Sequence, residues 1–260
     1  KKLLSILNNA ISCGLKDICI LDKKESEQKE ERVNCYKSLW IPSTGIIDSH
    51  GIMSKLEYLS KSRDVSFAYH TRVNSIKRKE HFYELSFENN DTLIHSDIVI
   101  NAGGLWSDRI SSMVDLNKYH LEYFKGDYFK SRSVKNLNCL IYPLPKISTL
   151  GIHSVLSLSG DVSFGPNMYK VNEINYSIDD RFKEQYIKEI KNLINVNEID
   201  LHKDFSGIRP KIKYKGHFND FIIQNESNNG YNNFINLIGI DSPGLTSSLA
   251  IADHVSNLIN

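Results

Sequence analysis

The sequence predicts a mixed α/β fold, in which a partial parallel α/β domain is interleaved with an antiparallel, β-rich domain. Helices and strands of α/β type open the chain, a β-rich stretch fills residues 121–166, and a strand–turn–helix returns over residues 234–259. The run Ile98–Val99–Ile100 is continuously apolar, as expected for a strand buried on both faces. Because the α/β pattern stops and then resumes, we expect two interleaved domains.

The apolar periodicity assigns most of the individual elements. It predicts helices over residues 3–12, 50–61, 105–114, 180–195 and 245–259. It predicts strands over residues 18–21, 65–69, 72–78, 83–87, 92–94, 98–100, 123–130, 140–142, 151–158, 162–164, 221–224 and 234–237. The charged run 22–32 is expected to be a solvated helix or loop, and Asn89–Asn90–Asp91 a hairpin turn.

The composition excludes several classes of protein. With 40% hydrophobic and 24% charged residues, the 260 residues suit an ordinary globular protein. A net charge of +1 does not create the basic field that nucleic acid requires. The four cysteines form no C-x-x-C pair, so we expect free thiols and no metal site. No apolar run is long enough to span a membrane, so we expect a cytoplasmic protein, with peripheral contact at the inner membrane as an alternative.

Two strand–turn–helix segments could bind a ligand. The strand at 98–100 runs into Asn101–Ala102–Gly103–Gly104, where glycines allow a ligand close to the backbone. A second strand runs into Asp241–Ser242–Pro243–Gly244–Leu245–Thr246, before a helix whose start carries partial positive charge. A tight turn without a ligand, or a capped helix, would give the same patterns, so both interpretations stay open here.

Some single residues suit acid–base chemistry and anion binding. Arg209, between a glycine and a proline, offers a planar fork that matches a carboxylate. His50, His120 and His153 can each take a proton near neutral pH. A structural role is the alternative for every one of these side chains.

Taken together, these segments resemble the FAD-dependent family of L-2-hydroxyglutarate dehydrogenases and oxidases, within the wider D-amino-acid-oxidase-like group. Residues 41–50 look like the family's PSTGIVDSH, residues 101–109 like NAAGLYSDR, and residues 140–145 like LIYPVP. The matches continue, in the family's order, at residues 124–130, 150–153, 164–167, 207–211 and 242–251. The resemblance covers about residues 36–255.

The resemblance implies an FAD cofactor and the oxidation of a 2-hydroxy acid by hydride transfer to flavin. Arg209 would hold the substrate carboxylate, His153 or His50 would take the hydroxyl proton, and Tyr142 would add a hydrogen bond. Quinone and oxygen both remain possible electron acceptors, and Lys125, Arg132 and Lys211 are candidates for a distal carboxylate. The cofactor would contact Val73, Ala102, Gly103, Trp106, Gly207, Ser242, Pro243, Gly244, Leu245 and Thr246.

One departure from the family concerns the G-x-G-x-x-G loop that cradles the FAD diphosphate. None of the 14 glycines has that spacing. We therefore expect a chain that lacks the N-terminal FAD-binding unit, binds FAD weakly by itself, and is completed by a separate N-terminal FAD-binding chain. The alternatives are an amino-acid or glycine oxidase of the same group, or a non-catalytic fragment that needs an N-terminal partner.

The resemblance also suggests the domain boundaries of a partial FAD-binding Rossmann-type domain interleaved with a β-rich substrate domain. Residues 1–45 would lead in from the missing unit, and residues 46–115 would form part of the FAD-binding domain. Residues 116–215 would form the substrate domain, and residues 216–260 would return to the FAD-binding domain.

Overall fold

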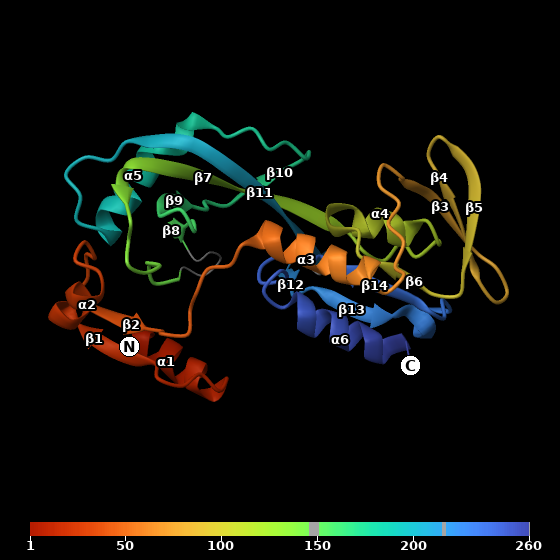
Figure 1. Ribbon diagram of the computed structural model, residues 1–260, viewed down its shortest axis with the longest axis horizontal. Coiled ribbons are helices and arrows are strands. Elements are labelled where there is room, and N and C mark those ends of the chain that lie inside the picture. Colours follow the sequence, from red (N-terminus) through yellow and green to blue (C-terminus); the bar gives the residue numbers. More distant parts are fainter. Residues whose placement is uncertain (146–150, 215–216, 260) are drawn as a thin grey trace. The chain divides into compact units, whose positions relative to one another are not determined.

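The structure is a computed structural model that describes residues 1–145, 151–214 and 217–259. The chain forms two compact units, each of which is described by itself. Unit 1 comprises Lys1–Val65, Gly126–Met168 and Tyr176–Gly207, and unit 2 comprises Ser66–Lys125, Tyr169–Asn175 and Ile208–Asn260. Helices, a parallel strand pair and antiparallel sheets all occur, which confirms the mixed α/β fold (Figure 1).

Unit 1 begins with two short strands and the helices around them. Strands β1 (Cys19–Asp22) and β2 (Lys37–Trp40) pair antiparallel. Between them, α2 (Lys23–Lys29) starts with a capping box, in which Asp22 and Glu25 each accept a hydrogen bond from the other's backbone N–H. The remaining elements that lie wholly in unit 1 are α1 (Lys2–Ser12), α3 (Ser49–Lys61), β8 (His153–Leu156), β9 (Asp161–Gly165), η2 (Asp180–Phe182) and α5 (Lys183–Leu193).

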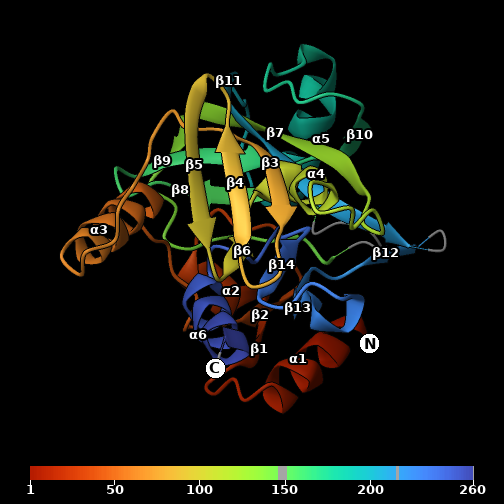
Figure 2. The ribbon, with the colours of Figure 1, turned by 90° about the vertical axis from the view of Figure 1, so that its right-hand side faces the viewer.

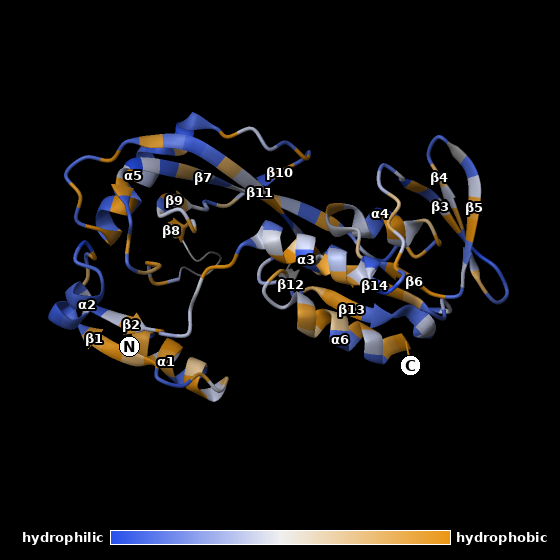
Figure 3. Cartoon of the chain, viewed as in Figure 1, coloured by the Kyte–Doolittle hydropathy of each residue, from blue (hydrophilic) through white to orange (hydrophobic). Residues whose placement is uncertain are grey.

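The core of unit 1 lies between α5 and the strands β7, β8 and β9. Strand β7 (Leu121–Lys135) pairs with β9, and β9 pairs with β8, all antiparallel. Tyr186 and Ile190 of α5 are fully buried against this core. Helix α1, by contrast, buries none of its residues, and Leu4 and Ile11 are more than half exposed. Figure 3 colours parts of this helix orange, the colour of hydrophobic residues.

Unit 2 contains two small sheets. Strands β3 (Val73–Arg78), β4 (Tyr83–Phe87) and β5 (Asn90–Ser96) form an antiparallel sheet (Figure 2). Strands β13 (Ile222–Asn225), β14 (Phe234–Ile238) and β6 (Val99–Asn101) form the other, with β6 and β14 parallel. The remaining elements are η1 (Gly104–Trp106), α4 (Ser107–Ser112), β10 (Tyr169–Val171), β12 (His217–Asn219), η3 (Glu226–Asn229) and α6 (Ser248–Ile259).

The second sheet of unit 2 is covered by two helices. Helix α4 packs against β6 and β14, and α6 packs against β13 (Figure 1). Phe234, Ile235 and Ile238 of β14 are fully buried. The parallel pair β6–β14 matters for function, because the carboxyl ends of both strands meet at one edge of the sheet.

The structure corrects several sequence predictions. Residues 65–69 and 140–142 are not strands, and the helix predicted from residue 245 begins at Ser248. The run 98–100 is not buried on both faces: Val99 is buried, but Ile100 is 45% exposed. The charged run 22–32 is not wholly solvated, because the Glu30 carboxylate is buried and accepts hydrogen bonds from Arg32 and the Asn138 amide.

Four of the described strands were missed by the sequence interpretation: β2, β10, β11 (Leu201–Tyr214) and β12. Strand β11 pairs with β12, and β10 pairs with β7. The chain passes from one unit to the other inside β7 and inside β11. The missed strands mix polar and apolar residues without a clear alternation, so the sequence pattern did not indicate them.

Candidate functional site

The turn between β6 and α4 is held by the side chain of Asn101. Its Oδ1 accepts the Gly103 N–H at 3.1 Å, and its Nδ2 donates to the Ser107 carbonyl at 2.7 Å. Gly104 adopts a positive φ of 55°, which favours glycine. Ala102 and Trp106 are exposed, so this turn presents a small side chain and an indole ring at the sheet edge.

Gly103 is required by packing inside the same turn. A Cβ atom at this position would collide with Cδ1 of Ile110 and lie 3.0 Å from Oδ1 of Asn101. The absence of a side chain therefore lets α4 approach the strand end closely. The predicted cofactor contacts Ala102, Gly103 and Trp106 thus belong to one tightly built turn.

The second predicted cofactor segment follows β14. Gly239 has a φ of 70°, the Gly244 N–H donates to the Asp241 carbonyl at 2.6 Å, and consecutive turns fill residues 242–247 before α6 begins. Gly244 is buried, because a Cβ there would meet the Ile240 side chain and lie 2.7 Å from the Asp241 carbonyl oxygen. The exposed residues of the segment are Ser242, Pro243, Leu245 and Thr246.

The backbone amides of this segment leave donors available. The N–H groups of Ser247 and Ser248 donate to Pro243 and Leu245 carbonyls. For the amides of Leu245 and Thr246, no acceptor exists within residues 1–145, 151–214 and 217–259. Two unpaired N–H groups ahead of a 12-residue helix form a donor cluster that suits a carbonyl or an anion.

The two turns lie at one edge of the unit 2 sheet. Asn101 ends β6 and pairs in register with Asn236 of the parallel strand β14. Both turns therefore follow the carboxyl ends of adjacent parallel strands, where cofactors bind in open α/β sheets. Val73, predicted at the adenine end of the cofactor, starts β3 and is half-buried against the core of the same unit.

Arg209 lies on β11 close to the second turn. Two and three residues further on, Lys211 forms an ion pair with Asp241 at 3.2 Å, and Ile212 would contact a Cβ at Gly239. The Arg209 side chain is partly buried, and no hydrogen bond or ion pair joins it to any residue that the structure describes. A guanidinium that is partly desolvated without an acidic partner favours binding of an external anion.

The predicted acid–base residues belong to unit 1. His153 is buried, its Nδ1 lies 2.9 Å from the Gly151 carbonyl oxygen, and its ring stacks on Tyr142 with 4.4 Å between centroids. Burial raises the pKa of the Tyr142 hydroxyl, although the side chain is still 48% exposed. His50 is exposed in the first turn of α3, and the predicted contact Gly207 lies on β11 with open space around it.

The candidates for a distal carboxylate differ in their surroundings. Lys211 is neutralised by Asp241, and Lys125 is buried and has contacts of its own. Arg132 is exposed in unit 1. Leu150, in the segment similar to the family's LGVH, lies outside the described residues.

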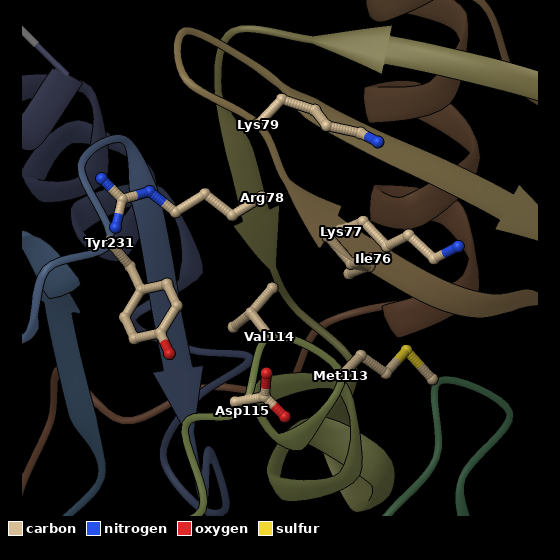
Figure 4. Close-up of a pocket in the computed structure, with 8 residues that line it drawn as sticks. All are labelled: Ile76, Lys77, Arg78, Lys79, Met113, Val114, Asp115 and Tyr231. Atoms are coloured by element: carbon tan, nitrogen blue, oxygen red, sulfur yellow. The ribbon is translucent and has the colours of Figure 1, made fainter.

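A pocket of about 490 Å³ in unit 2 contains none of the predicted site residues. Lys77, Arg78 and Lys79 line it together with Met113, Asp115 and Tyr231, and Arg78 extends toward the Tyr231 ring (Figure 4). The ammonium group of Lys79 is already paired with Glu84 at 3.4 Å. We therefore locate the candidate site at the sheet edge and not in this pocket.

Sequence reasoning missed the polar residues beneath the first turn. Asn236 and Glu226 are fully buried and hydrogen-bonded to one another, and Asn236 also accepts from Asn101. The signal that could have revealed them is the asparagine inside the apolar strand Phe234–Ile238, because a buried amide needs partners.

A parallel strand pair with glycine turns and unpaired amides at its carboxyl edge defines a nucleotide-cofactor protein of the α/β type. The chain belongs to the DAO family of FAD-dependent oxidoreductases, which matches residues 5–258. FAD, the cofactor predicted from the sequence, is the cofactor of this family. The unpaired amides of Leu245 and Thr246 fit the flavin, whose pyrimidine end gains negative charge on reduction.

Individual relatives agree with the family. The chain is 28% identical to the mitochondrial L-2-hydroxyglutarate dehydrogenase of Arabidopsis thaliana, over 92% of this chain and 59% of that protein. It is 29% identical to the glycerol 3-phosphate oxidase of Mycoplasma genitalium, over 96% of this chain and 66% of that protein. The chain thus spans less than two thirds of the length of both relatives.

Among solved structures, the fold matches the FAD-bound L-alpha-glycerophosphate oxidase of Mycoplasma pneumoniae with a TM-score of 0.85 and 23% identity, over 100% of this chain and 69% of that chain. Glycine oxidase of Bacillus cereus matches with a TM-score of 0.80 and 15% identity, over 99% of this chain and 68% of that chain. Within the described part of the chain, no helix has the length and apolar character needed to cross a membrane.

Proposed function

We propose that this protein takes part in the FAD-dependent oxidation of an anionic 2-hydroxy acid to a 2-oxo acid, with L-2-hydroxyglutarate as the first substrate to test. The observation that carries the proposal is Arg209, a partly buried guanidinium without an acidic partner among the described residues. Its position two residues before the Lys211–Asp241 pair supports a role beside the flavin-binding turn. The 28% identical Arabidopsis relative supports the choice of substrate.

The side chains would share the chemistry as follows. The Arg209 fork would bind the substrate carboxylate in two parallel hydrogen bonds. A histidine, His153 or His50, would accept the hydroxyl proton while the α-hydrogen leaves as hydride, which converts the alcohol to a ketone. The bound flavin supplies the hydride acceptor, and the amides of Leu245 and Thr246 would stabilise the negative charge that develops there.

His153 is the better placed of the two candidate bases. Because the Gly151 carbonyl can only accept, the neutral ring carries its proton on Nδ1, and Nε2 is the basic nitrogen. Stacking on Tyr142 fixes the plane of the ring. His50 is exposed on α3 and lacks such orientation by neighbouring groups in the described chain.

Glycerol 3-phosphate is the second candidate substrate. The Mycoplasma genitalium oxidase is 29% identical over 96% of this chain, and an arginine fork binds phosphate as well as carboxylate. The likeness to glycine oxidase, at 15% identity, concerns the fold alone. Glycine is therefore the control amine in a substrate screen.

The screen follows bleaching of the flavin under anaerobic conditions. The FAD-loaded chain is mixed with L-2-hydroxyglutarate, its D-enantiomer, glycerol 3-phosphate or glycine. Bleaching by L-2-hydroxyglutarate alone is the expected result. Bleaching by glycerol 3-phosphate alone would make glycerol 3-phosphate, and not L-2-hydroxyglutarate, the substrate. If the chain binds FAD but none of the four compounds reduces the flavin, the proposed function is wrong.

The partners are part of the same proposal. An N-terminal FAD-binding unit with the G-x-G-x-x-G loop would supply the diphosphate contacts, because none of the 14 glycines of this sequence has that spacing. Reoxidation with oxygen or a soluble quinone would identify the acceptor class. A cytoplasmic location, with or without peripheral membrane contact, stays a prediction.

A further inference from the structure

A buried carboxylate lies beneath the β6–α4 turn, outside any step of the proposed chemistry. Glu226, in η3, has no exposed surface. Its Oε1 accepts from the Tyr119 hydroxyl at 2.5 Å and from Nδ2 of Asn236 at 2.9 Å. Its Oε2 accepts from Lys118, Gln224 and Asn229 at 3.0, 3.0 and 2.6 Å.

The network continues from Glu226 to the turn. Oδ1 of Asn236 accepts from Nδ2 of Asn101 at 2.8 Å, and Oδ1 of Asn101 accepts the Gly103 N–H at 3.1 Å. Nδ2 of Asn236 also lies 3.2 Å from the Ser111 hydroxyl of α4. One chain of hydrogen bonds therefore joins Glu226 to the backbone of the turn.

The polarity of this chain is set by Glu226 at one end and, at the other, by the Ser107 carbonyl that accepts from Nδ2 of Asn101. An ionised carboxylate can only accept, so Asn236 must turn its NH₂ group toward Glu226 and its oxygen toward Asn101. Asn101 then turns its NH₂ group toward Asn236, which leaves its oxygen facing the Gly103 N–H. If Asn236 flipped, its NH₂ group would face that of Asn101, so Asn101 would either keep two donors in contact or flip and lose both the Ser107 carbonyl and the Gly103 N–H as partners.

We propose that Glu226 is a positioning residue for the flavin-contacting turn: through Asn236 it acts with the Ser107 carbonyl to fix the orientation of the Asn101 amide, which holds the Gly103 amide in place. This proposal rests on the proposed function in one respect, because the turn is taken as a flavin contact. The geometric part concerns the protein without cofactor. Glu226 itself would touch neither flavin nor substrate.

Two substitutions test the chain of hydrogen bonds. Glu226→Gln keeps the shape but can present an NH₂ group to Asn236, and Asn236→Leu removes the middle link. Tyr186→Phe is the matched control, because it removes a hydroxyl bonded to Asp127 and Asn167 in the core of unit 1. All variants are made in the full chain with Trp40→Phe, so that Trp106 of the turn is the remaining tryptophan.

The first readout uses the protein without flavin. Both network variants should increase acrylamide quenching of Trp106 and shift the Gly103 amide resonance, with exchange of that amide about tenfold faster. The control should leave the Gly103 resonance and the quenching unchanged at a comparable loss of thermal stability. Equal changes in the network variants and the control would overturn the proposal.

The second readout is binding of FAD and of riboflavin, which lacks the ADP half. The network variants should weaken riboflavin binding about tenfold, by the loss of an ordered turn, while the control should bind as the parent does. If the network variants shift the Gly103 amide resonance but bind riboflavin as tightly as the parent, the proposed role of Glu226 in flavin binding is wrong. If the parent binds neither compound, the positioning role of Glu226 toward flavin fails, whereas the readouts without flavin still show whether Glu226 holds the turn.

Discussion

The ring of Tyr142 stacks on the imidazole of His153, with an angle of 23° between the two planes. The stack and the Nδ1 contact to the Gly151 carbonyl restrict the imidazole in two directions, so Nε2 has a defined orientation. A base of defined orientation is more effective than an exposed one, because less freedom is lost on reaching the reactive geometry. This relationship distinguishes His153 from His50.

The first prediction concerns that base. His153→Gln in the FAD-loaded protein should slow reduction by the substrate by about 10²–10⁴-fold, the usual contribution of a general base. His50→Gln is the matched control and should change the rate less than about threefold. Stopped-flow measurement of flavin bleaching gives both rates, and the reverse order would assign the role to His50.

The second prediction concerns the anion site. Arg209→Lys keeps the charge but loses the bidentate fork, so KM for the substrate should rise about 10–100-fold, as expected for lost hydrogen bonds to a charged group. Arg181→Lys, at an exposed arginine that pairs with Asp179, should leave KM unchanged. Steady-state kinetics with L-2-hydroxyglutarate and glycerol 3-phosphate would show which anion depends on the fork. If KM is unchanged for both substrates, Arg209 does not bind the substrate anion.

The third prediction separates backbone strain from overpacking at Gly239. Gly239 and Gly230 both have positive φ, but an added Cβ at Gly239 would lie 2.6 Å from Cγ1 of Ile212, whereas at Gly230 it would meet an arginine nitrogen at 3.8 Å. Gly230→Ala should lower the free energy of unfolding by about 1 kcal/mol. Gly239→Ala should cost about 1–3 kcal/mol more, from overpacking.

Urea unfolding of the two variants measures this difference. A double variant that adds Ile212→Ala to Gly239→Ala should be less destabilised than the sum of the two single variants, because alanine removes both contacting atoms, Cγ1 and Cδ1 of Ile212. Equal losses for Gly230→Ala and Gly239→Ala would show that strain alone accounts for both.

The fourth prediction concerns pH and Glu226. Burial alone would raise the pKa of this carboxyl, but hydrogen bonds from Tyr119, Asn236, Lys118 and Gln224 outweigh burial, and the pKa lies below its ordinary value. A lowered folded-state pKa stabilises the fold above the ordinary value of about 4.3, and the stabilisation is lost as pH falls through the lowered value. At neutral pH the parent should therefore have a higher free energy of unfolding than Glu226→Gln, and acidification should remove this difference.

The measurement is the difference in unfolding free energy between parent and variant from neutral pH down to acidic pH. The difference should be constant at neutral pH and narrow as the solution becomes more acidic than about pH 4. The control is Glu27→Gln, which removes a carboxylate paired with Lys23. Its free energy of unfolding should differ from that of the parent by the same amount at every pH. A difference that widens on acidification would contradict the sign of the shift.

The sequence predicted those parts of the fold that carry a clear period. Helix α5, with Tyr186 and Ile190 on its apolar face, lies where the pattern indicated it. The hairpin β4–β5 was predicted with its turn displaced, because Asn90 and Asp91 belong to β5 and the turn lies at residues 88–89. Strand β11 was not predicted, because polar residues interrupt its apolar residues and because it contains Pro210. The start of α6 was misplaced, since the turns at 242–247 depend on contacts of Gly239 and Gly244 with neighbouring side chains.

The two turns of the candidate site could be predicted from the sequence, but the buried hydrogen-bond network beneath the first turn could not. Glycines and helix starts mark the turns that hold Gly103 and Thr246 in the sequence itself. Glu226, Asn236 and Asn101 come together only through the parallel register of β6 and β14, which joins residues 135 positions apart. No local pattern encodes such a contact.

Strands β7 and β11 have a consequence for attempts to dissect the molecule. Of the five points at which the chain crosses between the units, two lie inside these strands, at residues 125–126 and 207–208. A recombinant half made by cutting at either crossing would end in the middle of a hydrogen-bonded strand and expose a frayed edge prone to aggregation. For isotope labelling or split-reporter assays, the chain should therefore be divided in the loop after α3, near residue 65, where no strand is interrupted.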